Sequence, residues 1–281
     1  MADSGDSAPD PSVESNYGIP PPREWLTELV GTAALMAIGL SAVVLLFSTR
    51  SPLATRLTDP EVRRLVAGAF FVGTAAAVIY SPLGRRGGGH LNPALTFGFL
   101  HLGKLRWQGA VAYIGAQLCG ALAAAVLVLL VWGQWARAVN LGATAPGRLG
   151  PWAALAAEFF LTFVLVSVVF HFVDTPRLMR FTPVAAGLTT LLCILIEAPA
   201  STTSLNPARS LAPDVVAGSF KGLWIYLLAP PLGALVAAVA FRRTRGEIAC
   251  AKLIHTDDYV CHFRDCAYRK AAEAAAAKID G

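Results

Sequence analysis

The sequence has few charged residues. Asp, Glu, Lys and Arg together make up 15% of its 281 residues, whereas hydrophobic residues make up 55% and the mean hydropathy is +0.56. A soluble globular domain carries about 25% charged residues, so this composition argues against one. The hydrophobic residues form runs of about 20 residues, the length that a helix needs to cross a bilayer. We therefore expect an all-α membrane protein with spans over residues 26–47, 65–83, 108–132, 152–173, 181–198 and 222–241.

Groups with catalytic or cofactor-binding chemistry are almost absent from these runs. Of the five histidines, only His90, His101 and His171 lie in or near them. We find no nucleophile arranged with a base, and the glycine run 87–89 is not followed by the Lys-Ser/Thr of a phosphate-binding loop. We therefore expect neither an enzyme nor a bound cofactor.

The isoelectric point is near 9.1, but the basic residues lie in the connecting loops, where membrane topology usually places them. They therefore do not indicate binding of nucleic acid. The loops on the side of the two termini carry more Lys and Arg than those on the other side, so we expect both termini in the cytoplasm.

The tripeptide Asn-Pro-Ala occurs twice, at Asn92-Pro93-Ala94 and at Asn206-Pro207-Ala208. Proline fits the first turn of a helix and asparagine caps it, so we expect short helices over about 92–101 and 206–217. Beside membrane-length runs, such helices would begin inside the bilayer. Irregular backbone is tolerated there only where it is buried in protein or lines a watery cavity, so the pattern indicates a pore.

The two halves of this region, about 24–133 and 151–243, repeat each other. Glu28-x3-Thr in the first run matches Glu158-x3-Thr in the fourth, and each half contains three runs and one Asn-Pro-Ala. Three is odd, so the second half must be inverted in the membrane relative to the first. A carboxylate inside an apolar run needs a partner. We expect Glu28 and Glu158 to accept hydrogen bonds from loop N–H groups; the alternative is a place at a span end.

With His90-Leu91 before the first tripeptide and Arg209 after the second, these features resemble the major intrinsic protein family, the aquaporins and aquaglyceroporins. The resemblance covers about residues 24–243. It implies six helices plus two re-entrant half-helices in an inverted repeat, and it places His90 in the re-entrant turn that supports the pore.

The resemblance implies a passive channel for water, and for small neutral solutes such as glycerol or urea, that excludes protons and ions. It also implies a homotetramer, with one pore per subunit, in the plasma membrane. Two alternatives stay open. One is a glycerol or small-solute facilitator with little specificity for water, and the other is a non-conducting structural membrane protein of the same fold.

The resemblance further implies a narrow selectivity filter that includes Arg209. The resemblance places two more members three and twelve residues before Asn206, at Thr203 and Ile194. Strict water pores of the family often have His at the place of Ile194. We therefore expect a less polar filter that admits glycerol or urea as well as water.

The fourth filter residue should lie about twenty residues before Asn92. Gapless counting gives Val72, and allowing one residue for a longer loop gives Phe71. We favour Phe71, because an aromatic side chain usually pairs with the arginine.

Polar segments flank the channel region. Residues 1–23 are predicted to be a disordered leader rich in Asp, Ser and Pro, and residues 244–281 a cytoplasmic tail. The tail contains potential soft metal ligands within 17 residues, Cys250, His255, Cys261, His262 and Cys266. Four would suffice for tetrahedral zinc, but the spacing matches no standard zinc finger. We favour free thiols packed against the cytoplasmic face, with a zinc site as the alternative.

Overall fold

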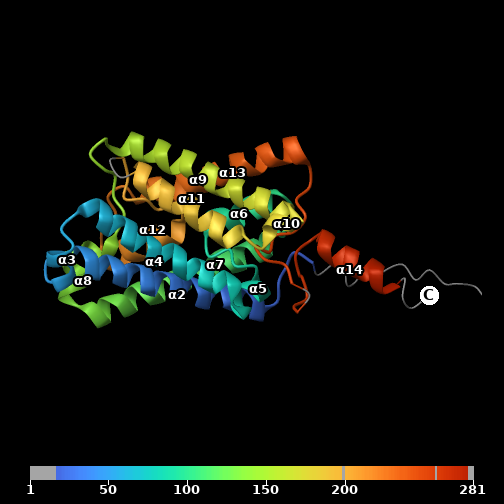
Figure 1. Ribbon diagram of the computed structural model, residues 1–281, viewed down its shortest axis with the longest axis horizontal. Coiled ribbons are helices and arrows are strands. Elements are labelled where there is room, and N and C mark those ends of the chain that lie inside the picture. The colour runs from blue at the N-terminus through green and yellow to red at the C-terminus, as the bar shows by residue number, and fades with distance from the viewer. Residues whose placement is uncertain (1–16, 198–199, 257, 278–281) are drawn as a thin grey trace, which may run out of the picture.

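The computed structural model describes residues 17–197, 200–256 and 258–277, and these residues form helices joined by loops (Figure 1). Within them, five helices are long and apolar enough to cross a membrane: α2 (Pro22–Phe47), α4 (Pro60–Tyr80), α7 (Trp107–Trp132), α9 (Pro151–Asp174) and α13 (Leu223–Arg245). The fifth predicted span forms α11 (Thr182–Glu197), which is apolar but only 16 residues long. The predicted all-α membrane fold is confirmed.

Two short helices begin inside this bundle, α6 (Pro93–His101) and α12 (Pro207–Ala217). Both have proline at the first helical position, as the two tripeptides predict. The remaining short helices lie in the connections and the tail: α3 (Pro52–Arg56), α5 (Pro82–Gly87), α8 (Gln134–Ala138), the 3-10 turn η1 (Asn140–Gly142), α10 (Pro176–Met179) and α14 (Ala267–Ala277).

The long helices pack in two equivalent pairs, α2 with α7 and α9 with α13. A glycine allows the close approach in each pair. A methyl group on Gly120 of α7 would collide with the carbonyl oxygen of Leu29, and one on Gly233 of α13 would collide with that of Phe159. Small residues let helix backbones meet in a membrane. Leu29 and Phe159 directly follow Glu28 and Glu158, so the inverted repeat extends to the contact between helices.

The distribution of polar side chains is the reverse of that in a soluble protein. Large apolar side chains such as Leu130, Phe160 and Leu188 are more than half exposed on the outer helix faces. Glu28 and Glu158, in contrast, are at most 1% exposed inside the bundle. The chain is therefore an integral, multi-pass membrane protein whose polar groups converge on its interior.

One end of the bundle is covered by both terminal segments. Of the predicted leader 1–23, residues 1–16 lie outside the described part of the chain. The rest differs from the prediction, because the N–H of Gly18 donates to the carbonyl of His262 at 2.7 Å and α2 already begins at Pro22. The tail beyond α13 folds back over the same end, beside α5 and α10, before α14 projects away (Figure 1). Its residues Ala251 and Phe263 are buried.

Candidate functional site

The two half-helices begin with identical caps. The side-chain oxygen of Asn92 accepts a hydrogen bond from the N–H of Ala94 at 2.8 Å, and that of Asn206 accepts one from Ala208 at 3.0 Å. Both asparagines have extended backbone, with φ of −153°. Each therefore ends its loop and starts its helix within a single residue.

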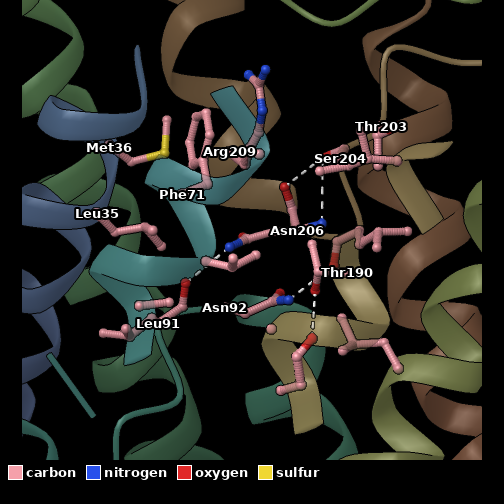
Figure 2. Close-up of a pocket in the computed structure, with 18 of the residues that line it drawn as sticks. Leu35, Met36, Phe71, Leu91, Asn92, Thr190, Thr203, Ser204, Asn206 and Arg209 are labelled. Carbon is pink, nitrogen blue, oxygen red and sulfur yellow. Dashed lines mark hydrogen bonds between the residues drawn. The ribbon is translucent and has the colours of Figure 1, made fainter. Parts of the chain in front are cut away.

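The asparagine side chains also tie the two loops to each other. The Nδ2 atom of Asn92 donates to the carbonyl of Leu205 at 2.8 Å, and that of Asn206 donates to the carbonyl of Leu91 at 2.9 Å. Both leucines have left-handed backbone, with φ of 51° and 56°. An asparagine amide has two N–H groups, so one on each residue is left for another acceptor. Figure 2 shows both side chains side by side in the cavity.

A buried carboxylate supports each loop. Glu28 accepts hydrogen bonds from the N–H groups of His90 and Leu91 at 2.8 and 2.7 Å. Glu158 accepts them from Ser204 and Leu205, both at 2.8 Å. Backbone N–H groups that no helix uses are thus satisfied in the middle of the bundle, where water is scarce.

The loops and helices enclose a cavity of about 470 Å³. Aliphatic side chains, among them Leu35 and Val166, form most of its wall, and the polar groups that reach it include Asn92, Asn206 and Thr190. Each helix N-terminus carries a positive partial charge. Two such termini meet at this point, so both contribute a positive potential beside the two asparagines.

All four predicted filter residues line this cavity, and so does the alternative, Val72. Arg209 lies over the ring of Phe71, with its guanidinium carbon 5.2 Å from the ring centroid, at one end of the view in Figure 2. Phe71 fits there because Gly39 of α2 has no side chain to collide with its ring. Ile194 packs against Gly68 on the facing helix.

The loop after α8 holds Arg209 in place. The Nη1 atom of Arg209 donates to the carbonyl of Gly142 at 2.8 Å. The same loop is fixed by Asp214, whose carboxylate accepts the N–H of Thr144 at 2.9 Å. The contact between Asp214 and Thr144 was not predicted, because the loop and α12 are about 70 residues apart in the chain.

The side chains behind the two carboxylates were not predicted either. Gln117 of α7 donates to Glu28 at 2.8 Å and to Thr96 at 3.0 Å. Ser201 donates to Glu158 at 2.9 Å and lies 3.1 Å from the hydroxyl of Tyr226. The one available signal was Gln117 in the middle of the apolar third run, because a polar residue there needs a buried partner.

His90 links the first loop to the tail. It is 3% exposed, and its Nδ1 lies 3.1 Å from the hydroxyl of Thr96. Its Nε2 lies 2.9 Å from the carbonyl oxygen of Ala251, and its ring stacks on Phe263 with centroids 5.6 Å apart. The resemblance implied a role for His90 within the turn. The tail contact was not predicted.

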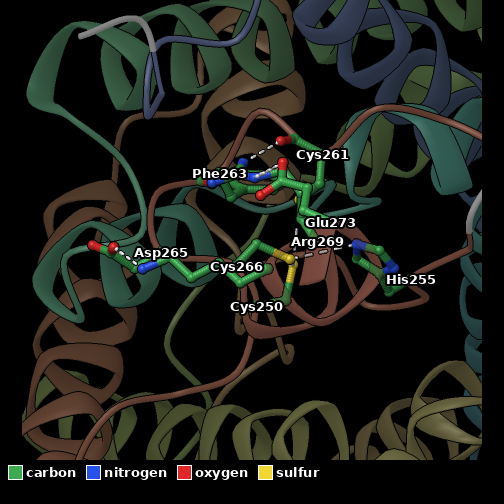
Figure 3. Close-up of polar contacts among 9 residues, drawn as sticks. Cys250, His255, Cys261, Phe263, Asp265, Cys266, Arg269 and Glu273 are labelled. Carbon is green, nitrogen blue, oxygen red and sulfur yellow. Dashed lines mark hydrogen bonds and ion pairs between the residues drawn. The ribbon is translucent and has the colours of Figure 1, made fainter. Parts of the chain in front are cut away.

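The tail brings together four of its five predicted soft ligands, Cys250, His255, Cys261 and Cys266 (Figure 3). The fifth, His262, points elsewhere, with its Nε2 3.8 Å from the carboxylate of Glu24. Burial lowers the pKa of His262, and the positive charges of Arg23, Lys252 and Arg269 lower it further.

A buried cation, Lys104, also contacts the tail: its ammonium group donates to the carbonyl of Asp265 at 2.8 Å. Burial lowers the pKa of Lys104 as well.

Comparison with known proteins agrees with this arrangement. The family model described as major intrinsic protein matches residues 19–241. Aquaporin NIP6-1 of Arabidopsis thaliana is 34% identical over 226 residues, which are 78% of this chain and 70% of the plant protein. Aquaporin NIP1-4 of Oryza sativa subsp. japonica is 36% identical over 221 residues, 78% of this chain and 76% of the rice protein.

Among solved structures, the aquaglyceroporin from Plasmodium falciparum has the same fold. It superposes with a TM-score of 0.64 at 22% sequence identity, covering 79% of this chain and 96% of that chain. The family match spans both tripeptides, both carboxylates and the long helices up to residue 241 of α13. The chain therefore belongs to the major intrinsic protein family.

Proposed function

We propose that the protein is a passive channel for water and small neutral solutes that excludes protons and ions. The observation that carries this proposal is the reciprocal pair of asparagines. Asn92 and Asn206 come from opposite halves, meet in one cavity, and each keep an amide N–H beyond the one that holds the facing loop.

The asparagine pair would act on the orientation of water. A water molecule between the half-helices accepts hydrogen bonds from the two amides and turns its own O–H groups outward, away from the positive helix ends. A continuous chain of identically oriented waters is then broken, so protons cannot relay through it. Aquaporin-type pores are known to exclude protons and cations with half-helix dipoles and an arginine. Arg209 supplies such a fixed charge here.

We assign the selectivity filter to Phe71, Ile194, Thr203 and Arg209. The contact between Arg209 and the Phe71 ring supports Phe71 over Val72 for the fourth place. Ile194 offers an apolar surface to the carbon skeleton of a solute, and Arg209 offers donors to its hydroxyl or carbonyl oxygens. This combination supports permeation by glycerol or urea beside water. A facilitator of such solutes with little preference for water is the second candidate, favoured by the aliphatic wall of the cavity.

We further propose a homotetramer in the plasma membrane with both termini in the cytoplasm. The exposed apolar faces of the outer helices suit both lipid and neighbouring subunits. The excess of Lys and Arg in the loops on the tail side supports the orientation. Cross-linking in native membranes tests the tetramer. Protease protection of an epitope at the C-terminus tests the orientation.

Solute permeability in proteoliposomes tests the function. Vesicles with the purified protein are mixed with a glycerol or urea gradient in a stopped-flow instrument, and re-swelling after the initial shrinkage reports solute entry. We expect shrinkage and re-swelling both to be faster than in protein-free vesicles. Rapid shrinkage with re-swelling at the protein-free rate would restrict the channel to water. Rates equal to protein-free vesicles in both phases, from folded protein, would contradict the proposal and favour a structural role.

A further inference from the structure

The tail contains a cluster of metal-binding side chains that the channel does not use. The ligand atoms of Cys250, His255, Cys261 and Cys266 all lie within 4.8 Å of one another (Figure 3). The cluster lies beyond residue 241, where the match to the family ends. It is therefore a feature of this chain's tail and not of the shared channel.

The distances within the cluster suit a tetrahedral metal site. The sulfur of Cys250 lies 3.5 Å from that of Cys261 and 3.4 Å from that of Cys266, and the sulfur of Cys266 lies 3.4 Å from Nε2 of His255. From the usual zinc–ligand bond lengths, a tetrahedral site has edges of about 3.8 Å between sulfurs and about 3.6 Å between sulfur and nitrogen. These separations leave room for one ion at the centre.

The chemistry of the cluster favours zinc over the other uses of cysteine. A disulfide would join two of the three sulfurs and would not involve the third thiol or the imidazole. Three thiolates and one imidazole form one of the standard donor sets of structural zinc. The N–H of Lys252 donates to the sulfur of Cys250 at 3.4 Å, and metal-ligating side chains are commonly oriented by such hydrogen bonds.

The segment that carries these ligands needs a source of folding free energy besides its own packing. Residues 246–266 form no helix or strand in their described part, yet Cys250, Cys261 and Cys266 are at most 2% exposed. A short segment without secondary structure has little core of its own, and metal binding can supply the missing folding free energy.

The same segment reaches the wall of the cavity. The N–H of Leu253 donates to the carbonyl of Gly88 at 3.0 Å, in the first re-entrant loop, and the Leu253 side chain lines the cavity. The carbonyl of Ala251 lies on His90. Leu253 and Ala251 stand between Cys250 and His255 in the chain, so whatever fixes those two ligands also fixes the contacts with the loop.

We propose that Cys250, His255, Cys261 and Cys266 bind one Zn²⁺ ion, which pins residues 250–255 against the first re-entrant loop at the mouth of the cavity.

Metal analysis of the full-length protein tests the first part. The protein is purified through a tag without histidine or cysteine, without chelators, and its metals are measured by inductively coupled plasma mass spectrometry. We expect about one zinc per chain, falling at least about fivefold in Cys250→Ser, His255→Gln, Cys261→Ser and Cys266→Ser. Cys119→Ser and His262→Gln remove the same groups outside the cluster and should keep the zinc.

Several results would overturn the zinc site. They are a zinc content under about 0.1 per chain even after dialysis against ZnCl₂, iron or copper in place of zinc, or an equal loss in the control variants. If a ligand variant does not fold, the zinc content and the cobalt spectrum of the wild-type protein still test the site. After chelation, Co²⁺ should restore occupancy with sulfur-to-cobalt charge-transfer absorption and the intense visible bands of tetrahedral cobalt, and a spectrum without them contradicts the assignment.

Hydrogen exchange tests the pinning. We expect chelation of the wild-type protein to speed exchange of the Leu253 amide at least about tenfold, because its bond to Gly88 is lost, and ZnCl₂ to restore protection. Amides in the middle of α7 serve as the internal control. Unchanged exchange at Leu253 after confirmed zinc removal would overturn the proposal.

Discussion

The two halves of the channel share one plan for holding a loop inside the membrane, but they complete it with different partners. In both, a glutamate accepts two loop N–H groups and an asparagine reaches across to the opposite loop. Behind the first glutamate stands Gln117, whereas Ser201 and Tyr226 stand behind the second.

The residues next to the two re-entrant loops differ more between the halves than the loop supports do. The first loop is closed by the tail, through His90, Ala251 and Phe263. The second is followed by Arg209, which faces the cavity and is held by the loop after α8. The repeated parts thus build the common pore, and the parts that are not repeated give one end a fixed charge and the other a cover. Substitutions in matched positions of the two halves can separate these roles.

Replacing either carboxylate should have the largest effect. Glu28→Leu leaves the N–H groups of His90 and Leu91 unsatisfied, and Glu158→Leu does so for Ser204 and Leu205. Each orphaned buried group costs about 1–3 kcal/mol, so we expect both variants to lose the folded state or to unfold at much lower temperature. Size-exclusion chromatography and thermal unfolding in detergent measure this. Glu61→Leu, which removes an exposed carboxylate, is the control. A stable Glu28 variant beside an unstable Glu158 variant would show that the two halves are not equivalent.

Widening the close helix contacts should have the next largest effect on stability. Gly120→Leu pushes α7 from α2, and Gly233→Leu pushes α13 from α9, because each side chain meets a backbone carbonyl. Overpacking of this kind typically costs about 1–3 kcal/mol or more. The same substitution at Gly115, also on α7, points into open space and should change the unfolding temperature little. Equal stability of the Gly115 and Gly120 variants would contradict the packing described here.

Removing the charge that only the second half carries should alter selectivity without unfolding the protein. Arg209→Val takes away the cation that lies over the ring of Phe71. We expect proton or cation leakage into proteoliposomes to rise by about tenfold or more, since a fixed charge in a low-dielectric pore is weakly screened. Dye-reported acidification of the vesicles under a proton gradient measures it. Arg137→Val, in the short helix α8 on the same side, is the control, and an unchanged leak would remove Arg209 from the barrier.

A change at Ile194 should have the smallest effect. Ile194→His narrows the filter with a polar ring, so we expect entry of glycerol or urea to fall a few-fold relative to water. The ratio of the two permeabilities from the same vesicles is the readout. Ile196→His, on the exposed side of α11, is the matched control. If the ratio is the same in both variants, Ile194 does not belong to the filter.

The repeated elements of this fold could be predicted because each has a local signal. Run length gave the long helices to within a few residues at most ends, and Asn-Pro placed the starts of α6 and α12. The matched glutamates predicted a partner in the loops, and such hydrogen bonds are present. The long-range contacts of the unrepeated parts have no such signal. The contact of His90 with Ala251 joins residues 161 apart, and the bond from Thr144 to Asp214 joins residues 70 apart. The spacing of the cysteines matches no standard zinc finger, and the four ligands come together only in the folded chain.

Measurement of water flux and proton flux in the same batch of proteoliposomes tests the central claim most directly. Proteoliposomes loaded with a pH-sensitive dye are exposed to a sucrose gradient and, in a parallel run, to a proton gradient. The asparagine pair and the facing helix ends predict water efflux at least about tenfold faster than in protein-free vesicles, with proton entry at the protein-free rate. Water efflux no faster than in protein-free vesicles, or water and proton fluxes that rise together, would contradict the account.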